Sequence, residues 1–181
     1  MYIRLAIQAG SMTIDAHEYF VKQSYRSRCS ICGPNGKLDL IIPVVHNKLS
    51  AIPMKEVKIH NESRWQSIHW RSFEAAYKKS PYFEFYEDEL RPFYEKKYEY
   101  LFDFNLKLLQ TVFKIKKAKV KIEITEKFEP LYTDLKDLRN YFQPKNKFET
   151  IGSYHQVFSD KHGFIDRLSF IDFLFNEANG R

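Results

Sequence analysis

The chain of 181 residues is long enough for one domain with a hydrophobic core. Its composition, 44% hydrophobic and 29% charged, is ordinary for a soluble globular protein. The net charge of +6 favours anionic partners such as phosphates, nucleotides or nucleic acid, although a solvated lysine-rich surface explains it equally well. No stretch is apolar enough to span a bilayer and no signal peptide is recognisable, so we expect a cytoplasmic protein without a membrane partner.

The N-terminal third reads mainly as strands. Residues 2–8 form a short mixed segment, and a strand follows from Ser11 to Ile14. The alternation of residues 24–31 predicts a strand that carries Arg26 and Arg28 on one face. A turn at 33–36 joins it to a strand at 38–45, and a further short strand is expected at 56–60. Together these segments predict an antiparallel sheet.

Cys29 and Cys32 are the only cysteines, and they form a single CxxC pair. A structural zinc site needs further ligands, and a thioredoxin-like pair belongs at a helix start rather than in a hairpin. We therefore expect neither a metal site nor a redox role. The chain also lacks a GxGxxG, Walker or GxSxG loop, so no cofactor is expected.

An aromatic helix is expected between residues 60 and 83. Trp65, His69 and Phe73 recur at four-residue spacing and share one face, which Trp70 widens. This apolar periodicity favours a core helix with one hydrogen-bonded histidine. The alternative is a helix that seats an anionic or ring-shaped ligand.

Two capping boxes predict helix starts. Ser63 with Gln66 opens the central helix, and Ser169 with Asp172 opens a final helix over residues 170–175 that is apolar nearly all round. The other expected elements are two short helical pieces around Pro92, a long helix at 94–114 and a strand at 119–125.

Strands followed by helices predict an α+β fold, with an antiparallel β-hairpin or sheet in the N-terminal third and helices packed on one face. No internal repeat, low-complexity tract or linker interrupts the chain, so a single domain over residues 1–181 is expected.

Several short motifs occur in one order along the chain. They are KQSYRSRC from Lys22, LIIPV from Leu40, the side chains of Trp65, His69 and Trp70, SPYF from Ser80, YHQVF from Tyr154 and LSFIDFLFN from Leu168. Together they resemble the WbqC-like family of bacterial proteins, over residues from about 9 to 179. Members of that family usually begin with a longer segment that carries a Tyr-x-Pro-Pro-like element, and residues 1–8 stand in its place here.

The family is named for a member of an O-antigen biosynthesis cluster. The resemblance therefore implies an enzyme or accessory protein of cell-surface polysaccharide biosynthesis. Transfer of an acyl or aminoacyl group to a nucleotide-linked amino sugar would suit this role, with an anionic nucleotide sugar or acyl donor as partner. Positive charge and many tyrosines leave an RNA-binding module as an alternative, although the basic residues are scattered. A non-catalytic structural or interaction protein is a third.

The candidate site joins motif residues to the central helix, and we expect its members to converge on one cleft between the hairpin and that helix. Arginine forks can hold an anion bidentately, and aromatic rings offer faces for a sugar or base. His69 is the first choice for acid–base catalysis and His155 the second, because imidazole titrates near neutral pH. The expected ligand-binding residues are Lys22, Arg26, Arg28, Trp65, Trp70, Tyr82, Tyr154 and Gln156.

For two further groups of residues, the sequence favours a structural role over a catalytic one. Asp15 and His17 point the same way in an extended segment, so they could orient a base, but a partly exposed polar edge is the simpler interpretation. Cys29 could act as a nucleophile beside His69 or His155, but it also suits a small buried position.

Overall fold

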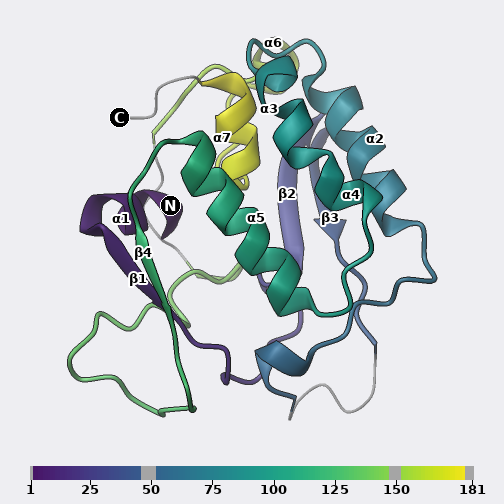
Figure 1. The fold of residues 1–181 in the computed structure, drawn as a ribbon. Coiled ribbons are helices and arrows are strands. Elements are labelled where there is room, and N and C mark those ends of the chain that lie inside the picture. Colours follow the sequence, from purple (N-terminus) through teal and green to yellow (C-terminus); the bar gives the residue numbers. More distant parts are fainter. Residues whose placement is uncertain (1, 46–51, 147–151, 178–181) are drawn as a thin grey trace. The chain divides into compact units, whose positions relative to one another are not determined.

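A computed structural model describes the chain over residues 2–45, 52–146 and 152–177 (Figure 1). The chain divides into two compact units, each assembled from three segments. The first unit comprises Met1–Ser27, Pro43–His60 and Tyr98–Glu149, and the second comprises Arg28–Ile42, Asn61–Lys97 and Thr150–Arg181. Helices and strands occur together, which confirms the α+β fold class. The single domain over 1–181 stays a prediction. In the described ranges, no helix has the length and apolar character that crossing a bilayer requires.

The first unit is built around its longest helix. Its elements are α1 (Tyr2–Ala9), β1 (Ser11–Ile14), η2 (Met54–Glu56), α5 (Leu101–Ile115) and β4 (Lys121–Ile124). The buried face of α5 carries Leu101, Phe102, Phe104, Leu109, Val112 and Phe113. The 3₁₀ turn η2 packs against α5, and Leu101 N donates to the carbonyl oxygen of Val57 at 2.9 Å. The segment at 2–8, expected to be short and mixed, is a helix that buries Ile3 and Ala6.

The strand at Ser11–Ile14 is confirmed, but its expected antiparallel partner is wrong. It pairs in parallel with β4, so that Ser11 lies opposite Lys121 and Ile14 opposite Ile124. Parallel strands need a long connection between them. Here the connection runs from Ile14 to Lys121, and the alternation of residues within one strand does not indicate a partner so far along the chain. The expected strand at 56–60 is wrong as well, because this segment makes only isolated bridges, Val44 with Ile59 and Lys58 with Tyr100.

The second unit contains the predicted β-hairpin. Its elements are β2 (Arg28–Gly33), β3 (Gly36–Ile41), α2 (Trp65–Tyr77), α3 (Phe83–Leu90), α4 (Pro92–Glu95), α6 (Ser159–His162) and α7 (Phe170–Asn176). The hairpin is antiparallel and closes where Gly33 pairs with Gly36. Gly36 has φ +98°, a conformation that favours glycine and suits a tight turn. Both α2 and α7 pack against β2.

The strand expected over residues 24–31 begins only at Arg28. The preceding residues turn because the Ser24 hydroxyl donates to the carbonyl oxygen of Val21 at 2.6 Å and Gln23 has φ +55°. Arg26 therefore lies in a turn, and the prediction that it shares a strand face with Arg28 is wrong.

Both capping boxes are wrong, although both helices are present. The α2 helix begins at Trp65 without a side-chain cap, and the Gln66 amide donates instead to the carbonyl oxygens of Phe93, at 3.3 Å, and Lys96. Ser169 precedes α7, but its hydroxyl accepts from Ser30 N at 2.9 Å, and no side-chain cap closes the helix.

Candidate functional site

The predicted site residues fall into both units. Lys22 and Arg26 belong to the first unit, and the other eight belong to the second. Convergence of all ten on one cleft stays a prediction. The geometry within each unit nevertheless shows what each side chain touches.

Arg26 is already paired with a carboxylate. Its Nε donates to Glu18 Oε1 at 2.7 Å, and its Nη2 forms an ion pair with the other oxygen of the same carboxylate. A second hydrogen bond runs from Nη2 to the carbonyl oxygen of Arg139 at 3.2 Å. An anion bound at Arg26 would have to displace Glu18 from the fork. Lys22, in the same turn, is exposed.

His69 lies in the aromatic core of the second unit. Its Nε2 is 3.1 Å from the carbonyl oxygen of Ile41, which can only accept, so this nitrogen carries the proton. The Trp65 ring stands edge-on to the imidazole with centroids 5.1 Å apart, and the Tyr94 ring lies 6.2 Å away. Burial lowers the pKa of His69 to about 4, and the hydrogen bond to Ile41 opposes this shift only in part. The imidazole is thus neutral near pH 7.

Trp70 packs in the same aromatic core, and Tyr82 precedes α3. Trp70 is buried and its Nε1 donates to Glu74 Oε1 at 3.1 Å, while the Arg91 guanidinium lies 5.9 Å from its ring centroid. Tyr82 is half-buried beside Phe85, and its backbone N–H donates to α7. The ring packing of Trp70 fits the core alternative considered for the central helix, whereas the ring contact of Tyr82 is with the exposed Phe85.

A second group of motif residues meets at a buried carboxylate that the sequence indicated only as part of a helix cap. Asp172, on α7, is 0% exposed. Its Oδ1 accepts from the Tyr77 hydroxyl at 2.5 Å, and its Oδ2 accepts from the Tyr154 hydroxyl at 2.6 Å. Gln156 Nε2 lies 3.3 Å from Oδ2, and Cys32 N donates to Oδ1 at 3.4 Å. We call these five residues the Asp172 centre.

The donors around Asp172 are all neutral. Within the described ranges, no lysine, arginine or histidine forms an ion pair with it. Desolvation raises its pKa above the usual aspartate value, and the hydrogen bonds from Tyr154 and Tyr77 oppose the rise. Burial and the nearby carboxylate also raise the pKa of both tyrosines. Protons are therefore held on the hydroxyls, and the carboxylate is more basic than one in water.

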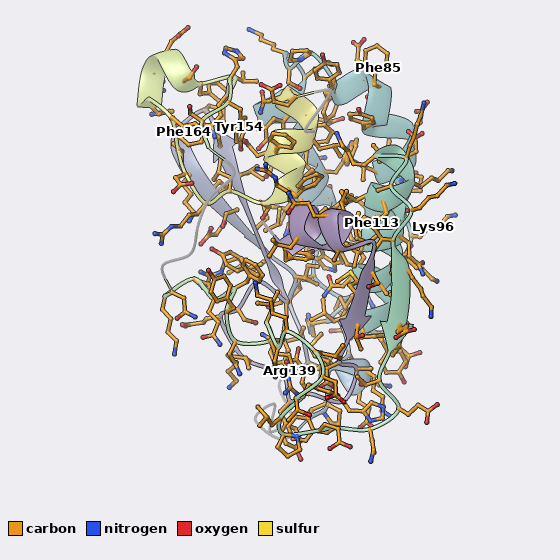
Figure 2. All side chains as sticks on the ribbon, turned by 90° about the vertical axis from the view of Figure 1, so that its left-hand side faces the viewer. Phe85, Lys96, Phe113, Arg139, Tyr154 and Phe164 are labelled. Atoms are coloured by element: carbon orange, nitrogen blue, oxygen red, sulfur yellow. The ribbon has the colours of Figure 1, made fainter. Side chains whose placement is uncertain are left out.

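Tyr154 connects this centre to the outer part of the unit. It is half-buried, and its ring stands edge-on to Phe164 and Phe173 with centroids 5.3 and 5.2 Å away. Figure 2 shows Tyr154 and Phe164 beside each other, and Phe164 is exposed. His155, next in the chain, is exposed. Gln156 is buried and exchanges hydrogen bonds with the Ile165 backbone at 2.8 and 2.9 Å, which fixes the segment that carries Tyr154.

The hairpin adds a second polar group. Arg28 Nη1 pairs with Asp39 Oδ2 at 3.2 Å, and the Ser30 hydroxyl donates to Asp39 Oδ1 at 2.6 Å. Arg28 Nε is buried without a hydrogen-bond partner among the described residues. Burial raises the pKa of Cys29 to about 12, so its thiol stays protonated. The nucleophilic thiolate therefore does not form readily at this position.

The Asp172 centre can hold and move a proton but offers no metal-ligand set. Among the residues that the structure describes, no three His, Cys, Asp or Glu side chains are grouped to hold a metal ion. Asp15, predicted beside His17, instead caps the backbone: its Oδ1 accepts from the backbone N–H groups of His17 and Glu18 at 2.9 and 3.0 Å.

The sequence did not predict Tyr77 or Ser30 as part of a site, and it predicted Asp172 and Ser169 only as a helix cap. One signal was available, since Asp172 is the single acidic residue inside an otherwise apolar helix, and a buried carboxylate needs partners. Tyr77 gave no such signal because it continues the apolar face of α2.

The model of the WbqC-like protein family matches residues 2–141 of the chain. The chain belongs to the WbqC-like protein family. The matched range includes the hairpin and α2 but ends before Tyr154 and Asp172. No curated protein and no solved structure shows significant similarity to the chain.

Proposed function

We propose that this WbqC-like protein is an enzyme of cell-surface polysaccharide biosynthesis that transfers an acyl or aminoacyl group to the amine of a nucleotide-linked amino sugar. Family membership supports the biological setting. The observation that carries the chemistry is Asp172, a fully buried carboxylate held by the hydroxyls of Tyr77 and Tyr154. Such a group is a base of raised pKa, and Tyr154 gives it a route to a bound substrate.

In the proposed step, the sugar amine attacks the carbonyl carbon of an acyl thioester or ester. The new C–N bond forms while the C–S or C–O bond breaks, and the leaving thiol or alcohol takes the bond's electron pair. The amine loses one proton to Tyr154 Oη as Tyr154 passes its own proton to Asp172. Return of that proton to the leaving group restores both residues, so no oxidant or metal is consumed.

The other candidate residues support this step in different ways. Arg28 is proposed to bind a substrate phosphate or carboxylate through its guanidinium in exchange for the ion pair with Asp39 at 3.2 Å. His155 is exposed and serves as a second acid–base group. Lys22 and Arg26 remain proposed anion contacts. His69, Trp65, Trp70 and Gln156 are buried and are proposed to hold the aromatic and polar core in place, whereas the half-buried Tyr82 remains a proposed ligand contact.

RNA binding is the less supported alternative. The basic residues are scattered along the sequence and do not form a stripe, which is the pattern that nucleic-acid binding favours. Filter binding over a salt series separates the two functions, because RNA affinity supplied by phosphate contacts falls steeply as salt rises.

The test begins with thermal shifts of the full chain against nucleotide-linked amino sugars and acyl thioesters, since a ligand that binds the native state stabilises it. Product formation is then followed by mass spectrometry. Tyr154→Phe keeps the ring packing but removes the hydroxyl, so it should retain ligand-induced stabilisation and lose product. Tyr19→Phe, which changes an exposed tyrosine, is the matched control and should retain both. Absence of stabilisation by any such ligand, together with salt-sensitive RNA binding, would contradict the proposal.

A further inference from the structure

The outer edge of β4 is a hydrogen-bonding surface that no described residue of the first unit uses. The ladder to β1 is formed by alternate residues, as Lys121 N donates to Gly10 O at 2.9 Å and Thr125 N donates to Ile14 O at 3.1 Å. In a parallel pair the intervening residues face the other edge, so the backbone groups of Ile122 and Ile124 point away from β1. No hydrogen bond joins these outward groups to another residue in the described ranges.

The surroundings of this edge are open and partly apolar. Ile124 is 45% exposed, and the side chains of Lys121 and Glu123 are 74% and 57% exposed. Beside the edge, a hollow of about 350 Å³ lies between α5 and the segment that leads into β4. It is lined by Gln110, Phe113, Lys114, Ala118, Val120 and Ile122. An added strand would find backbone partners and space for apolar side chains.

The order of charges along β4 indicates which strand can pair with its outer edge. Lys121 and Glu123 flank Ile122 on the face opposite to Val120, Ile122 and Ile124. We propose that two copies of this chain associate by pairing β4 with β4 antiparallel, about a two-fold axis through Ile122. In this register Lys121 of each copy lies opposite Glu123 of the other, and Val120 lies opposite Ile124.

The same register satisfies the backbone. Ile122 pairs with Ile122, and Ile124 pairs with Val120, so the outward N–H and C=O groups of both strands exchange hydrogen bonds. Shifting the axis to the neighbouring residue places Lys121 opposite Lys121, or Glu123 opposite Glu123, which is unfavourable. Charges on an edge strand usually discourage pairing with other chains, but here they select one register of self-pairing.

The interface is isologous, since each copy contributes the same strand. It joins the two sheets into one four-stranded sheet in the order β1, β4, β4, β1, with the apolar side chains of both β4 strands on one face. Because β4 has only four residues, the buried area belongs to the class of weak, transient contacts. Association should therefore depend strongly on concentration.

Sedimentation velocity over a concentration series tests the proposal with the full chain. We expect the average mass to rise with concentration from 21.7 kDa towards twice that value. Lys121→Glu turns two favourable cross-strand pairs into two repulsive ones, so association should weaken about tenfold. Adding Glu123→Lys to the same chain reverses both charges and should restore it. Lys55→Glu makes the same charge change at an exposed residue of η2 and should leave association unchanged.

Hydrogen exchange supplies a second measurement. Amides of Ile122 and Ile124 should become protected as concentration rises, and in Lys121→Glu this protection should be reduced. A mass of 21.7 kDa at every concentration would overturn the proposal. So would failure of the double variant to recover, or protection that does not vary with concentration, which would mean that another segment of the same chain covers the edge.

Discussion

Asp15 in the first unit and Asp172 in the second are both buried aspartates, 7% and 0% exposed, but their partners differ in kind. Asp15 Oδ2 accepts from the Arg139 guanidinium at 2.8 Å, and its Oδ1 accepts from two backbone amides and the Thr125 hydroxyl. Asp172 is held by two tyrosine hydroxyls, one amide side chain and one backbone amide.

The difference separates an anchoring carboxylate from one suited to proton transfer. The charge of Asp15 is balanced by a cation that also binds the backbone of residues 129 and 130, so the pair holds a loop. Asp172 has no such cation among its described partners, and its raised pKa follows from desolvation. A buried carboxylate with only neutral donors costs stability and is therefore a candidate for function.

The largest effect is expected from removing the acceptor at the centre of the second unit. Asp172→Ala leaves the hydroxyls of Tyr77 and Tyr154 without their acceptor, so we expect a loss of about 4 kcal/mol in the free energy of unfolding. Asp172→Asn keeps one acceptor oxygen and the side-chain volume, and should lose about 1 kcal/mol. Urea denaturation at pH 7 measures both. Equal losses in the two variants would contradict the acceptor role.

A second prediction concerns the pH dependence set by His69. The unfolded imidazole has a pKa of 6.5 and the folded one about 4, so between these values the unfolded state binds more protons. Stability is fully present above pH 6.5 and falls by about 3 kcal/mol as pH falls to 4. His69→Gln should remove this slope, measured as the difference between wild type and variant in urea denaturation at each pH.

Asp172 contributes with the opposite sign, because its folded pKa lies above its unfolded value. Protonation of the folded state then adds stability as pH falls through the folded pKa. This contribution is present in both wild type and His69→Gln, so it cancels in their difference. Ile68→Ala, at an exposed position beside His69, should leave the slope intact. A slope that survives His69→Gln would show that another group is responsible.

The cation in the first unit gives a third prediction. Arg139→Met removes the ion pair with Asp15 and the hydrogen bonds to the carbonyl oxygens of Glu129 and Pro130, so stability should fall by about 2 kcal/mol. Hydrogen exchange should show the lost protection within residues 126–146, with the Asp172 centre unchanged. Arg4→Met, at an exposed position, is the control. Loss of protection around Asp172 of the same size would mean that the two carboxylates are not independent.

The smallest effect is expected at the contact between the hairpin and α7. Ser169→Ala leaves the backbone N–H of Ser30 without its acceptor, at a cost of about 1 kcal/mol. Ser67→Ala, at an exposed position of α2, should change stability by less. Thermal denaturation of the two variants decides this, and indistinguishable melting temperatures would show that water replaces the serine hydroxyl.

Local rules predicted the parts of the fold that depend on neighbours in sequence. The hairpin follows from alternation on both sides of Gly33 to Gly36, and α7 follows from its apolar run. The same rules failed where a side chain had a competing partner. Ser169 has the spacing of a cap, but the hairpin amide at Ser30 takes its hydroxyl. Arg26 continues an alternating pattern, but Ser24 turns the backbone before it.

Long-range partners account for the rest. Nothing near Ser11 in the sequence indicates that its strand pairs with residues 121–124. The candidate site shows the same limit: Tyr154 and Gln156 were predicted as ligand contacts from a motif, whereas their common acceptor, Asp172, required knowledge of which residues meet in space. Periodicity reports which face of an element is buried, but it does not report what that face touches.

The chain leaves each compact unit and later returns to it, which has a consequence for synthesis on the ribosome. Cys32 and Asp172, which share a hydrogen bond, are 140 residues apart. At about 5–20 residues per second, roughly 7–28 s pass between the translation of the two. By the end of that interval the hairpin and Tyr77 have been made, so the second unit can complete its polar core only once α7 has been translated. A nascent chain stalled before α7 should therefore remain a substrate for chaperones and proteases.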